Sequence, residues 1–359
     1  MAACRRYLSA APRDLAALPS EPYFAPFPCS QGSVTVASPP ELVPLAAIRD
    51  AAQHLRGVAV RTPLLPVDEV AERLGVPVFV KPESLQRVGA FKLRGAFNLI
   101  RQLAAGGTAG VITYSSGNHG QAVAYVARRF GLRAVIVMPE TVTAVKRAGV
   151  ERLGGEVVLA GRTSQDRYAR AMELAERERL AVVPPFDHPA IIAGQGTAGL
   201  ELVEDCPDVA TVAVPVGGGG LAAGVATAVR ALRPEAAVVT VEPEGAPTFE
   251  RARAAGKPVT LERTGSVADG LLPLRIGALT FAHLMRAGAS ASLVSDAAIV
   301  RAVRFALDRL KLVVEPSGAA TLAWLLGQQV GSVAGPVVAV LSGGNIEWEG
   351  LQALLATPA

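Results

Sequence analysis

The sequence contains little cysteine, few aromatic residues and no long apolar run. Three cysteines in 359 residues have neither the even number of a disulfide framework nor the spacing of a metal site, which favours a reducing cytoplasm. No stretch reaches the roughly 18 uninterrupted apolar residues that a membrane-spanning helix needs. The sequence therefore argues against a disulfide-rich secreted protein and against an integral membrane protein.

Charge of either sign is also limited, because 35 basic residues stand against 31 acidic ones, a net charge of +4. The basic residues are scattered among acids without a basic run or interleaved aromatics, so neither nucleic acid nor a membrane surface is an expected partner. Lysine is the scarce basic residue. The five lysines are Lys81, Lys92, Lys146, Lys257 and Lys311.

Apolar residues and glycine are abundant. Half of the residues are apolar and 36 are glycine, a composition typical of a buried parallel sheet flanked by helices. From residue 41 onward, apolar strand-like runs alternate with segments of helical periodicity, which predicts repeated βα units and an α/β fold. The stretch 196–206 is predicted as a helix, and Lys92 is placed in a loop before the next helix. The chain exceeds the roughly 250–300 residues of a single core, so two lobes are expected.

Four glycine-containing segments lie next to predicted strands and helix starts. They are VGAFKLRGA (88–96), SSGNHG (115–120), PVGGGGL (215–221) and LSGGN (341–345). Ligands of open parallel sheets bind at the carboxyl ends of the strands. We therefore interpret the four segments as parts of one site.

Four consecutive glycines join a predicted strand to a helix. Without side chains these residues can adopt unusual dihedrals and turn their N–H groups toward one anion, assisted by the helix N-terminus. This predicts a phosphate-binding loop. Its members are Gly217, Gly218, Gly219 and Gly220.

The same loop permits a second interpretation. Gly217, Gly219 and Ala222 fit the spacing G-x-G-x-x-A, and Glu242 ends the following strand, where a carboxylate could hold a ribose hydroxyl. An NAD(P)-dependent oxidoreductase is therefore an alternative function. This alternative leaves the other three glycine segments unexplained.

The remaining segments carry a candidate nucleophile and polar groups. Lys92 follows Phe91 between Gly89 and Gly95, which indicates a partly desolvated amine of the kind that acts as a nucleophile. The turn at 115–119 can bind a carboxylate, and its asparagine amide can donate to a phenolate oxygen. Ser342, at the end of the last strand, could donate to a heterocycle nitrogen. The turn consists of Ser115, Ser116, Gly117, Asn118 and His119.

Taken together, these segments resemble the pyridoxal 5′-phosphate enzymes of fold type II (tryptophan synthase β-like), and more narrowly the threonine/serine ammonia-lyase (dehydratase) and serine racemase family. The resemblance covers about residues 41–350. The segments KPESLQRVGAFKLRGA, SSGNHGQA, IIAGQGTAGLE, PVGGGGL, VADGL, EPSGAA and LSGGN occur in the order of the family. Leu93 after Lys92 and His119 after Asn118 distinguish the chain from threonine synthases and cysteine synthases.

The resemblance implies a role for each segment. Lys92 would form the internal aldimine with the cofactor and then abstract the Cα proton of the substrate. Phe91 would pack on the pyridine ring, Asn118 would bond the 3′-oxygen, the loop 217–220 would bind the phosphate and Ser342 would bond the pyridine nitrogen. The turn 115–119 would hold the substrate carboxylate. The implied reaction is β-elimination of L-threonine or L-serine to 2-oxobutanoate or pyruvate and ammonia.

Two positions leave the activity open within the family. Ser116 matches the second acid/base residue of serine racemases, so racemisation is an alternative, as is dehydration of hydroxyaspartate. The divalent-cation site of the family uses a Glu, a backbone carbonyl and an Asp. Glu242 and Ala246 match the first two, but Thr248 replaces the Asp. A hard cation loses an anionic oxygen there, so no metal is expected.

The resemblance also predicts the domain organisation. Residues 1–40 would be a flexible extension, 41–101 and 190–359 a large cofactor-binding lobe, and 102–189 a small mobile lobe whose closure excludes water. The chain ends soon after Gly350, so a C-terminal regulatory domain is not expected. We expect a cytoplasmic homo-oligomer, a dimer or larger, that binds a small amino-acid substrate.

Overall fold

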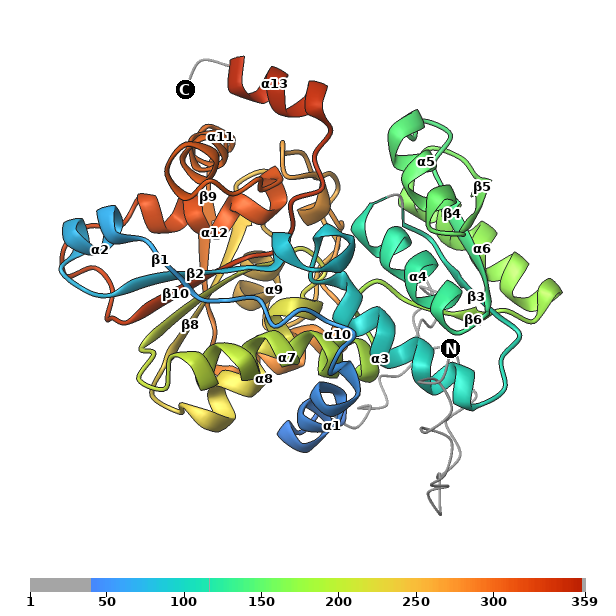
Figure 1. Ribbon diagram of the computed structural model, residues 1–359, viewed down its shortest axis with the longest axis horizontal. Helices are drawn as coiled ribbons and strands as arrows, with labels where there is room; N and C mark the ends of the chain where they lie inside the picture. The colour runs from blue at the N-terminus through green and yellow to red at the C-terminus, as the bar shows by residue number, and fades with distance from the viewer. Residues whose placement is uncertain (1–39, 116, 357–359) are drawn as a thin grey trace, which may run out of the picture. The chain divides into compact units, whose positions relative to one another are not determined.

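The computed structural model describes residues 40–115 and 117–356. Over these residues the strands form two sheets flanked by helices (Figure 1). The first sheet has the order β1-β2-β10-β7-β8-β9 and the second the order β5-β4-β3-β6. All neighbours are parallel except β1 and β2, which confirms the α/β expectation. The first sheet contains β1 (Leu65–Pro66), β2 (Val78–Pro82), β7 (Thr211–Pro215), β8 (Ala237–Pro243), β9 (Ser290–Val294) and β10 (Val337–Leu341).

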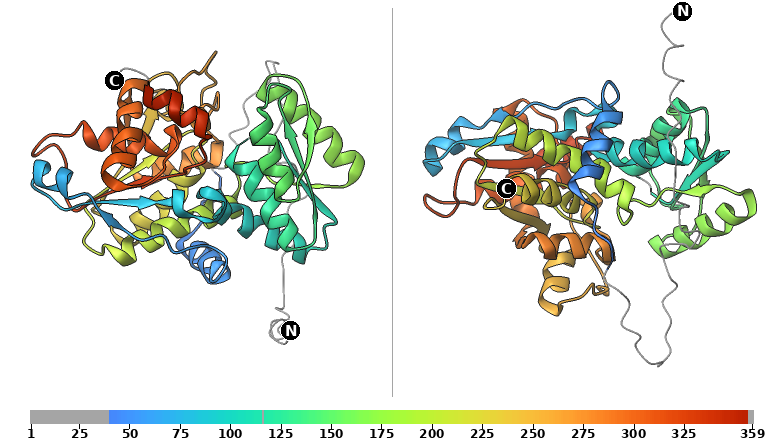
Figure 2. Two further views of the ribbon diagram at one scale, coloured as in Figure 1. Left: turned by 45° about the horizontal axis from the view of Figure 1, so that its top comes forward. Right: turned by 90° about the horizontal axis from the view of Figure 1, so that it is seen from below.

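The six-stranded sheet is covered on both faces because its central strands are apolar on both sides. Val337 and Ala339 of β10 point into one buried cluster, and Val338 and Val340 point into the cluster on the opposite face. Helices α11 and α12 cover the first face and α7 and α8 the second (Figures 1 and 2). The first group is α2 (Asp68–Leu74), α11 (Asp296–Phe305), η4 (Ala306–Leu310), α12 (Pro316–Leu326) and α13 (Trp348–Ala356). The second is α1 (Leu45–Leu55), α7 (Pro189–Asp205), α8 (Gly220–Leu232), α9 (Thr248–Ala255) and α10 (Ala278–Ala287).

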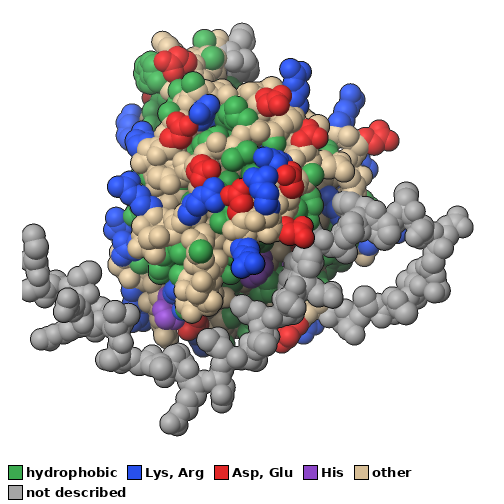
Figure 3. Space-filling model, turned by 90° about the vertical axis from the view of Figure 1, so that its right-hand side faces the viewer, with side chains coloured by type: hydrophobic (Ala, Val, Ile, Leu, Met, Phe, Trp, Pro, Cys, Tyr) green, Lys and Arg blue, Asp and Glu red, His purple; other side chains and the backbone are tan. Residues whose placement is uncertain are grey.

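The four-stranded sheet lies within the segment between Gly110 and Val182. Ile112 and Val135 face a cluster that includes residues of α6, whereas Val111 and Ile136 face a cluster shared with α3 and α4. These elements are α3 (Lys92–Ala105), β3 (Gly110–Thr113), α4 (Asn118–Arg129), β4 (Arg133–Met138), α5 (Ala144–Arg152), β5 (Glu156–Leu159), α6 (Ser164–Glu178) and β6 (Ala181–Val182). Figure 3 shows a face on which basic and acidic side chains are interspersed.

Two local predictions need correction. Helix α7 begins at Pro189, well before the predicted start at 196, because its glycines allow close helix packing instead of ending the helix. A Cβ at Gly194 would lie 2.5 Å from the carbonyl oxygen of Arg94, and one at Gly199 would lie 2.8 Å from Cα of Val225. Lys92 is the first residue of α3 and not part of the preceding loop.

Candidate active site

Lys92 lies in a desolvated position without an acidic partner. Its Nζ donates a hydrogen bond to the carbonyl oxygen of Pro185 (2.7 Å) and lies 5.1 Å from the centroid of the Phe91 ring. No ion pair of Lys92 is found within the part of the chain that the structure describes. Burial lowers the pKa of Lys92 to about 8, because a desolvated ammonium is destabilised relative to the amine. A substantial fraction of the free amine is therefore available near neutral pH.

Ser342 and the segment before Lys92 are joined through the backbone. The N–H of Phe91 donates to the carbonyl oxygen of Ser342 (3.1 Å), and Ala90 forms a β-bridge with Gly343. The Ser342 side chain is buried, and its Oγ lies 3.5 Å from the carbonyl oxygen of Ser317. The end of β10 is thus held directly against the start of α3.

The glycine loop is buried, and its carbonyl and N–H groups differ in their hydrogen bonding. The carbonyl oxygens of Gly217 and Gly218 lie 3.0 and 2.8 Å from the hydroxyls of Thr248 and Thr280. The N–H groups of residues 217–219 have no acceptor among the residues that the structure describes. Gly219 has a φ of +92° and caps the N-terminus of α8. Buried N–H groups rarely stay unpaired, so this loop is suited to bind an anion.

The segment 185–187 links the glycine loop to Lys92. Pro185 accepts the hydrogen bond of Lys92, and the Phe186 ring covers the loop so closely that a Cβ at Gly218 would lie 2.2 Å from it. Asp187 accepts from three N–H groups at the start of α10, including that of Thr280. Sequence reasoning missed this segment, because no pattern near 185–187 indicates what it contacts.

Asn118 is fixed by two partners. Its Nδ2 donates to Oε1 of Glu315 (2.6 Å), and its Oδ1 accepts from Nδ2 of Asn345 (2.8 Å). An amide nitrogen carries two hydrogens, so one N–H of Asn118 remains for a further acceptor. Burial, and then the nearby charge of Asp269, raise the pKa of Glu315 to about 8, which keeps this carboxyl largely protonated at neutral pH.

The turn at 115–119 opens helix α4 toward the same region. The His119 side chain is buried, with Nε2 3.0 Å from the carbonyl oxygen of Val183. Burial and then the charge of Lys92 lower the pKa of His119 to about 3, so the ring is neutral. Among the described residues of this turn, the backbone N–H groups, the Ser115 hydroxyl and the remaining side-chain N–H of Asn118 can bind an anion. Ser116 lies outside the described residues.

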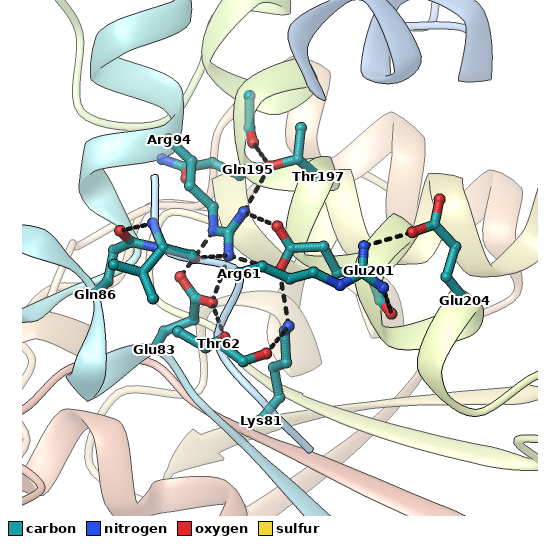
Figure 4. Close-up of polar contacts among 12 residues, drawn as sticks. Arg61, Thr62, Lys81, Glu83, Gln86, Arg94, Gln195, Thr197, Glu201 and Glu204 are labelled. Carbon is teal, nitrogen blue, oxygen red and sulfur yellow. Dashed lines mark hydrogen bonds and ion pairs between the residues drawn. The ribbon is translucent and has the colours of Figure 1, made fainter. Parts of the chain in front are cut away.

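A buried ion cluster surrounds Arg94 (Figure 4). Arg94 follows Lys92 by two positions on α3. Arg94 contacts Glu83 (2.8 Å) and Glu201 (2.7 Å), and Lys81 donates to Glu201 (2.7 Å). Lys81, Glu83 and Arg94 have no exposed surface. Thr62 donates to Glu83 and accepts, through its carbonyl, from Lys81. The cluster therefore fixes the first turn of α3 to η1 (Glu83–Leu85) and α7.

The family model described as pyridoxal-phosphate dependent enzyme matches residues 55–343. The chain belongs to this family. It is 41% identical over 307 residues to the L-threonine ammonia-lyase of Geobacter sulfurreducens, covering 85% of this chain and 76% of that protein. It is 38% identical over 313 residues to the L-threo-3-hydroxyaspartate ammonia-lyase of a Pseudomonas species, covering 85% and 96%.

A third relative is longer than this chain. The chain is 43% identical over 298 residues to the biosynthetic L-threonine dehydratase of Pasteurella multocida, and the match covers 82% of the chain but only 58% of that enzyme. Solved structures agree on the fold. Maize serine racemase matches with a TM-score of 0.83 at 34% identity, covering 87% of this chain and 97% of that one. The processed form of threonine deaminase isoform 2 from Solanum lycopersicum matches with a TM-score of 0.81 at 34% identity, covering 89% and 96%.

This pyridoxal phosphate enzyme is thus of fold type II and related to threonine dehydratases and serine racemases. The described residues fit the cofactor, because the free N–H groups of loop 217–219 suit a phosphate and Lys92 offers an amine of lowered pKa. In this enzyme the oxidoreductase alternative loses its support. The carboxylate of Glu242 accepts from the Thr248 hydroxyl and from the N–H groups of Phe249 and Glu250, and is not free for a ribose.

Two further features bear on the sequence predictions. Within the described residues no helix is long and apolar enough to cross a membrane. Glu315, Asn345 and Arg94 were given no defined role from sequence. Glu315 and Asn345 are 197 and 227 positions from Asn118, and Arg94 is 107 positions from Glu201.

Proposed function

We propose that this enzyme catalyses the β-elimination of L-threonine or L-serine to a 2-oxo acid and ammonia. The observation that supports it most directly is the low-pKa amine of Lys92 next to the unpaired N–H groups of loop 217–219, in a chain about 40% identical to threonine ammonia-lyases. When bound, pyridoxal phosphate supplies an electron sink that acidifies the Cα proton of the amino acid.

Lys92, Phe91, Asn118 and the glycine loop would each have a separate role in binding the cofactor or in moving the proton. Lys92 anchors the cofactor and, once displaced by substrate, takes the Cα proton on its Nζ. Phe91 lies against the ring, and the loop Gly217 to Gly220 holds the phosphate. The remaining N–H of Asn118 donates to the phenolate oxygen, with its amide oriented by Glu315 and Asn345.

Ser342 and the turn 115–119 complete the assignment. The Ser342 hydroxyl would contact the pyridine nitrogen and would not keep it protonated as a carboxylate would, so the bound cofactor would be a weaker electron sink, which favours prompt loss of the β-hydroxyl. The first N–H groups of α4 bind the substrate carboxylate. Serine racemisation through Ser116, and elimination from hydroxyaspartate, are the alternatives within this family.

We further propose that the enzyme is a cytoplasmic homo-oligomer. Residues 102–189 would move as a small lobe. Ion pairing between α5 and η3 (Asp269–Leu271) supports the closure, because the Lys146 Nζ lies 2.7 Å from Oδ2 of Asp269. Light scattering of the purified protein measures the assembly.

The experiment that tests the proposal compares products. The holoenzyme is incubated separately with L-threonine, L-serine and L-threo-3-hydroxyaspartate, and 2-oxo acid, ammonia and D-serine are measured. We expect threonine or serine to give equal amounts of 2-oxo acid and ammonia. D-serine formed faster than pyruvate would overturn the lyase assignment, and a preference for hydroxyaspartate would overturn the substrate assignment.

Lys92→Ala should lower turnover by more than about a thousandfold, because it removes both the covalent anchor and the base. It should also abolish the visible band that reports the covalent link to the cofactor. Lys257→Ala, at an exposed lysine, is the matched control and should retain both. A Lys92→Ala variant with wild-type turnover would contradict the role of Lys92.

A further inference from the structure

By the resemblance described above, Thr248 stands at the position where the divalent-cation site of the family has an Asp ligand. We propose that the Thr248 side chain replaces that cation in this enzyme, so that the phosphate loop is fixed by hydrogen bonds and needs no metal. This inference goes beyond the proposed reaction, because it concerns how the loop is held and not which substrate is converted.

The first observation is that Glu242 already has hydrogen-bond partners on both of its carboxyl oxygens. This carboxylate is fully buried at the end of β8. Its Oε1 lies 3.0 Å from the Thr248 hydroxyl and accepts from the N–H of Phe249 (2.7 Å), and its Oε2 accepts from the N–H of Glu250 (2.9 Å). The N-terminus of α9 thus surrounds this carboxyl group with hydrogen-bond donors.

The second observation is that the matching backbone carbonyl is also engaged. The carbonyl oxygen of Ala246 accepts from the N–H of Thr248 (2.9 Å). The neighbouring carboxylate of Glu250 is paired with Nε of Arg251 (3.4 Å). No group of three His, Cys, Asp or Glu side chains that could hold a metal ion is found in the described part of the chain. Ca²⁺ and Mg²⁺ favour carboxylate ligands, and of the three matching positions only Glu242 supplies a carboxylate.

The third observation connects Thr248 to the cofactor site. Its hydroxyl lies 3.0 Å from the carbonyl oxygen of Gly217 as well as 3.0 Å from Glu242. The N–H in the same trans peptide group as this carbonyl is that of Gly218, which points away from Thr248 and has no described acceptor. Thr248 is therefore a positioning residue that joins β8, α9 and the phosphate loop in one buried contact.

The test measures cation dependence and cofactor affinity without turnover. Wild-type holoenzyme is treated with chelator, and its melting temperature is recorded with and without millimolar Mg²⁺, Mn²⁺ or Ca²⁺. We expect no change with any of the three cations. Thr248→Asp restores an anionic oxygen ligand and should gain a cation-dependent rise in melting temperature, because a ligand that binds only the folded state stabilises it.

Two further variants keep the test decisive where Thr248→Asp fails to fold. Thr248→Val removes the hydroxyl and should raise the dissociation constant for pyridoxal phosphate about tenfold, whereas Thr248→Ser should keep it near the wild-type value. Thr240→Val is the matched control, because Thr240 lies on β8, the strand that carries Glu242, and its buried hydroxyl bonds the carbonyl of Ser290 instead of the phosphate loop.

Three results would overturn the proposal. A wild-type enzyme that is stabilised by one of the cations after chelation binds a metal after all. A folded Thr248→Asp variant without any cation response shows that Thr248 does not occupy the cation position. A Thr248→Val variant that binds pyridoxal phosphate as tightly as the Thr240→Val control shows that the hydroxyl does not position the loop.

Discussion

Lys92 and Arg94 lie two positions apart on α3, and the charged residues around each of them behave in opposite ways. The Arg94 cluster is buried and fully paired: Arg94 contacts both Glu83 and Glu201. Burial alone would raise the pKa of Glu83, but the Arg94 guanidinium lowers it below its ordinary value. Glu83 and Arg94 therefore keep their charges over the physiological pH range, and the cluster fixes the helix.

His119 and Glu315 are buried and Lys92 is partly buried, and none of the three has an opposite charge in direct contact. Lys92 and His119 have lowered pKa values and Glu315 a raised one, each with burial as the main cause. Their charged forms are thus disfavoured, and Lys92 and Glu315, whose pKa values lie near 8, can exchange protons near neutral pH. Pairing gives rigidity to the first group, and its absence gives reactivity to the second.

The largest effect is expected from breaking the paired group. Arg94→Met leaves the carboxylates of Glu83 and Glu201 buried without their partner, which should lower the free energy of unfolding by about 3–5 kcal/mol. Urea unfolding measures it. The control is Arg133→Met, because Arg133 also contacts two carboxylates but is exposed. This variant should lower the free energy of unfolding by less than about 1 kcal/mol. Equal losses in the two variants would contradict the distinction.

The unpaired group should respond to pH. Because the pKa of Glu315 is about 8 in the folded state and ordinarily 4.5, the folded protein retains a proton there that the unfolded chain has lost. This contribution to stability falls as pH rises between those values, by up to about 1.4 kcal/mol per pH unit. Glu315→Gln carries no such proton but keeps an oxygen acceptor for Asn118. The variant should therefore gain stability relative to wild type from pH 5 to pH 8.

Urea unfolding of the holoenzyme at several pH values measures the difference for Glu315→Gln. Glu349→Gln, at an exposed glutamate, is the control and should parallel the wild type. A constant offset between Glu315→Gln and wild type across this pH range would show that Glu315 is not held in its protonated form.

The comparison also explains what the sequence could predict. The apolar strand runs and the glycine segments beside them are local signals, and they predicted the α/β fold and the loop of Gly217 to Gly220. The early start of α7 was missed, because Gly194 and Gly199 look like loop residues until the helices packed against them are known. The Arg94 cluster was missed because Glu201 is 107 positions away, a contact that no sequence pattern encodes. The roles of Lys92 and Asn118 in the reaction remain predictions.

The smallest effect is expected from an ion pair that is neither buried nor part of either group. Lys146 and Asp269 are 36% and 61% exposed, so Lys146→Met should lower the free energy of unfolding by less than about 1 kcal/mol. This pair joins α5 to η3, and if α5 moves as the proposed small lobe, the variant should raise KM for L-threonine more than it affects stability. Salt screens exposed pairs, so added NaCl should raise the wild-type KM toward that of the variant. A loss of stability as large as that of Arg94→Met would show instead that the pair fixes the fold. A difference in KM between wild type and Lys146→Met that does not change with salt would exclude closure through this contact.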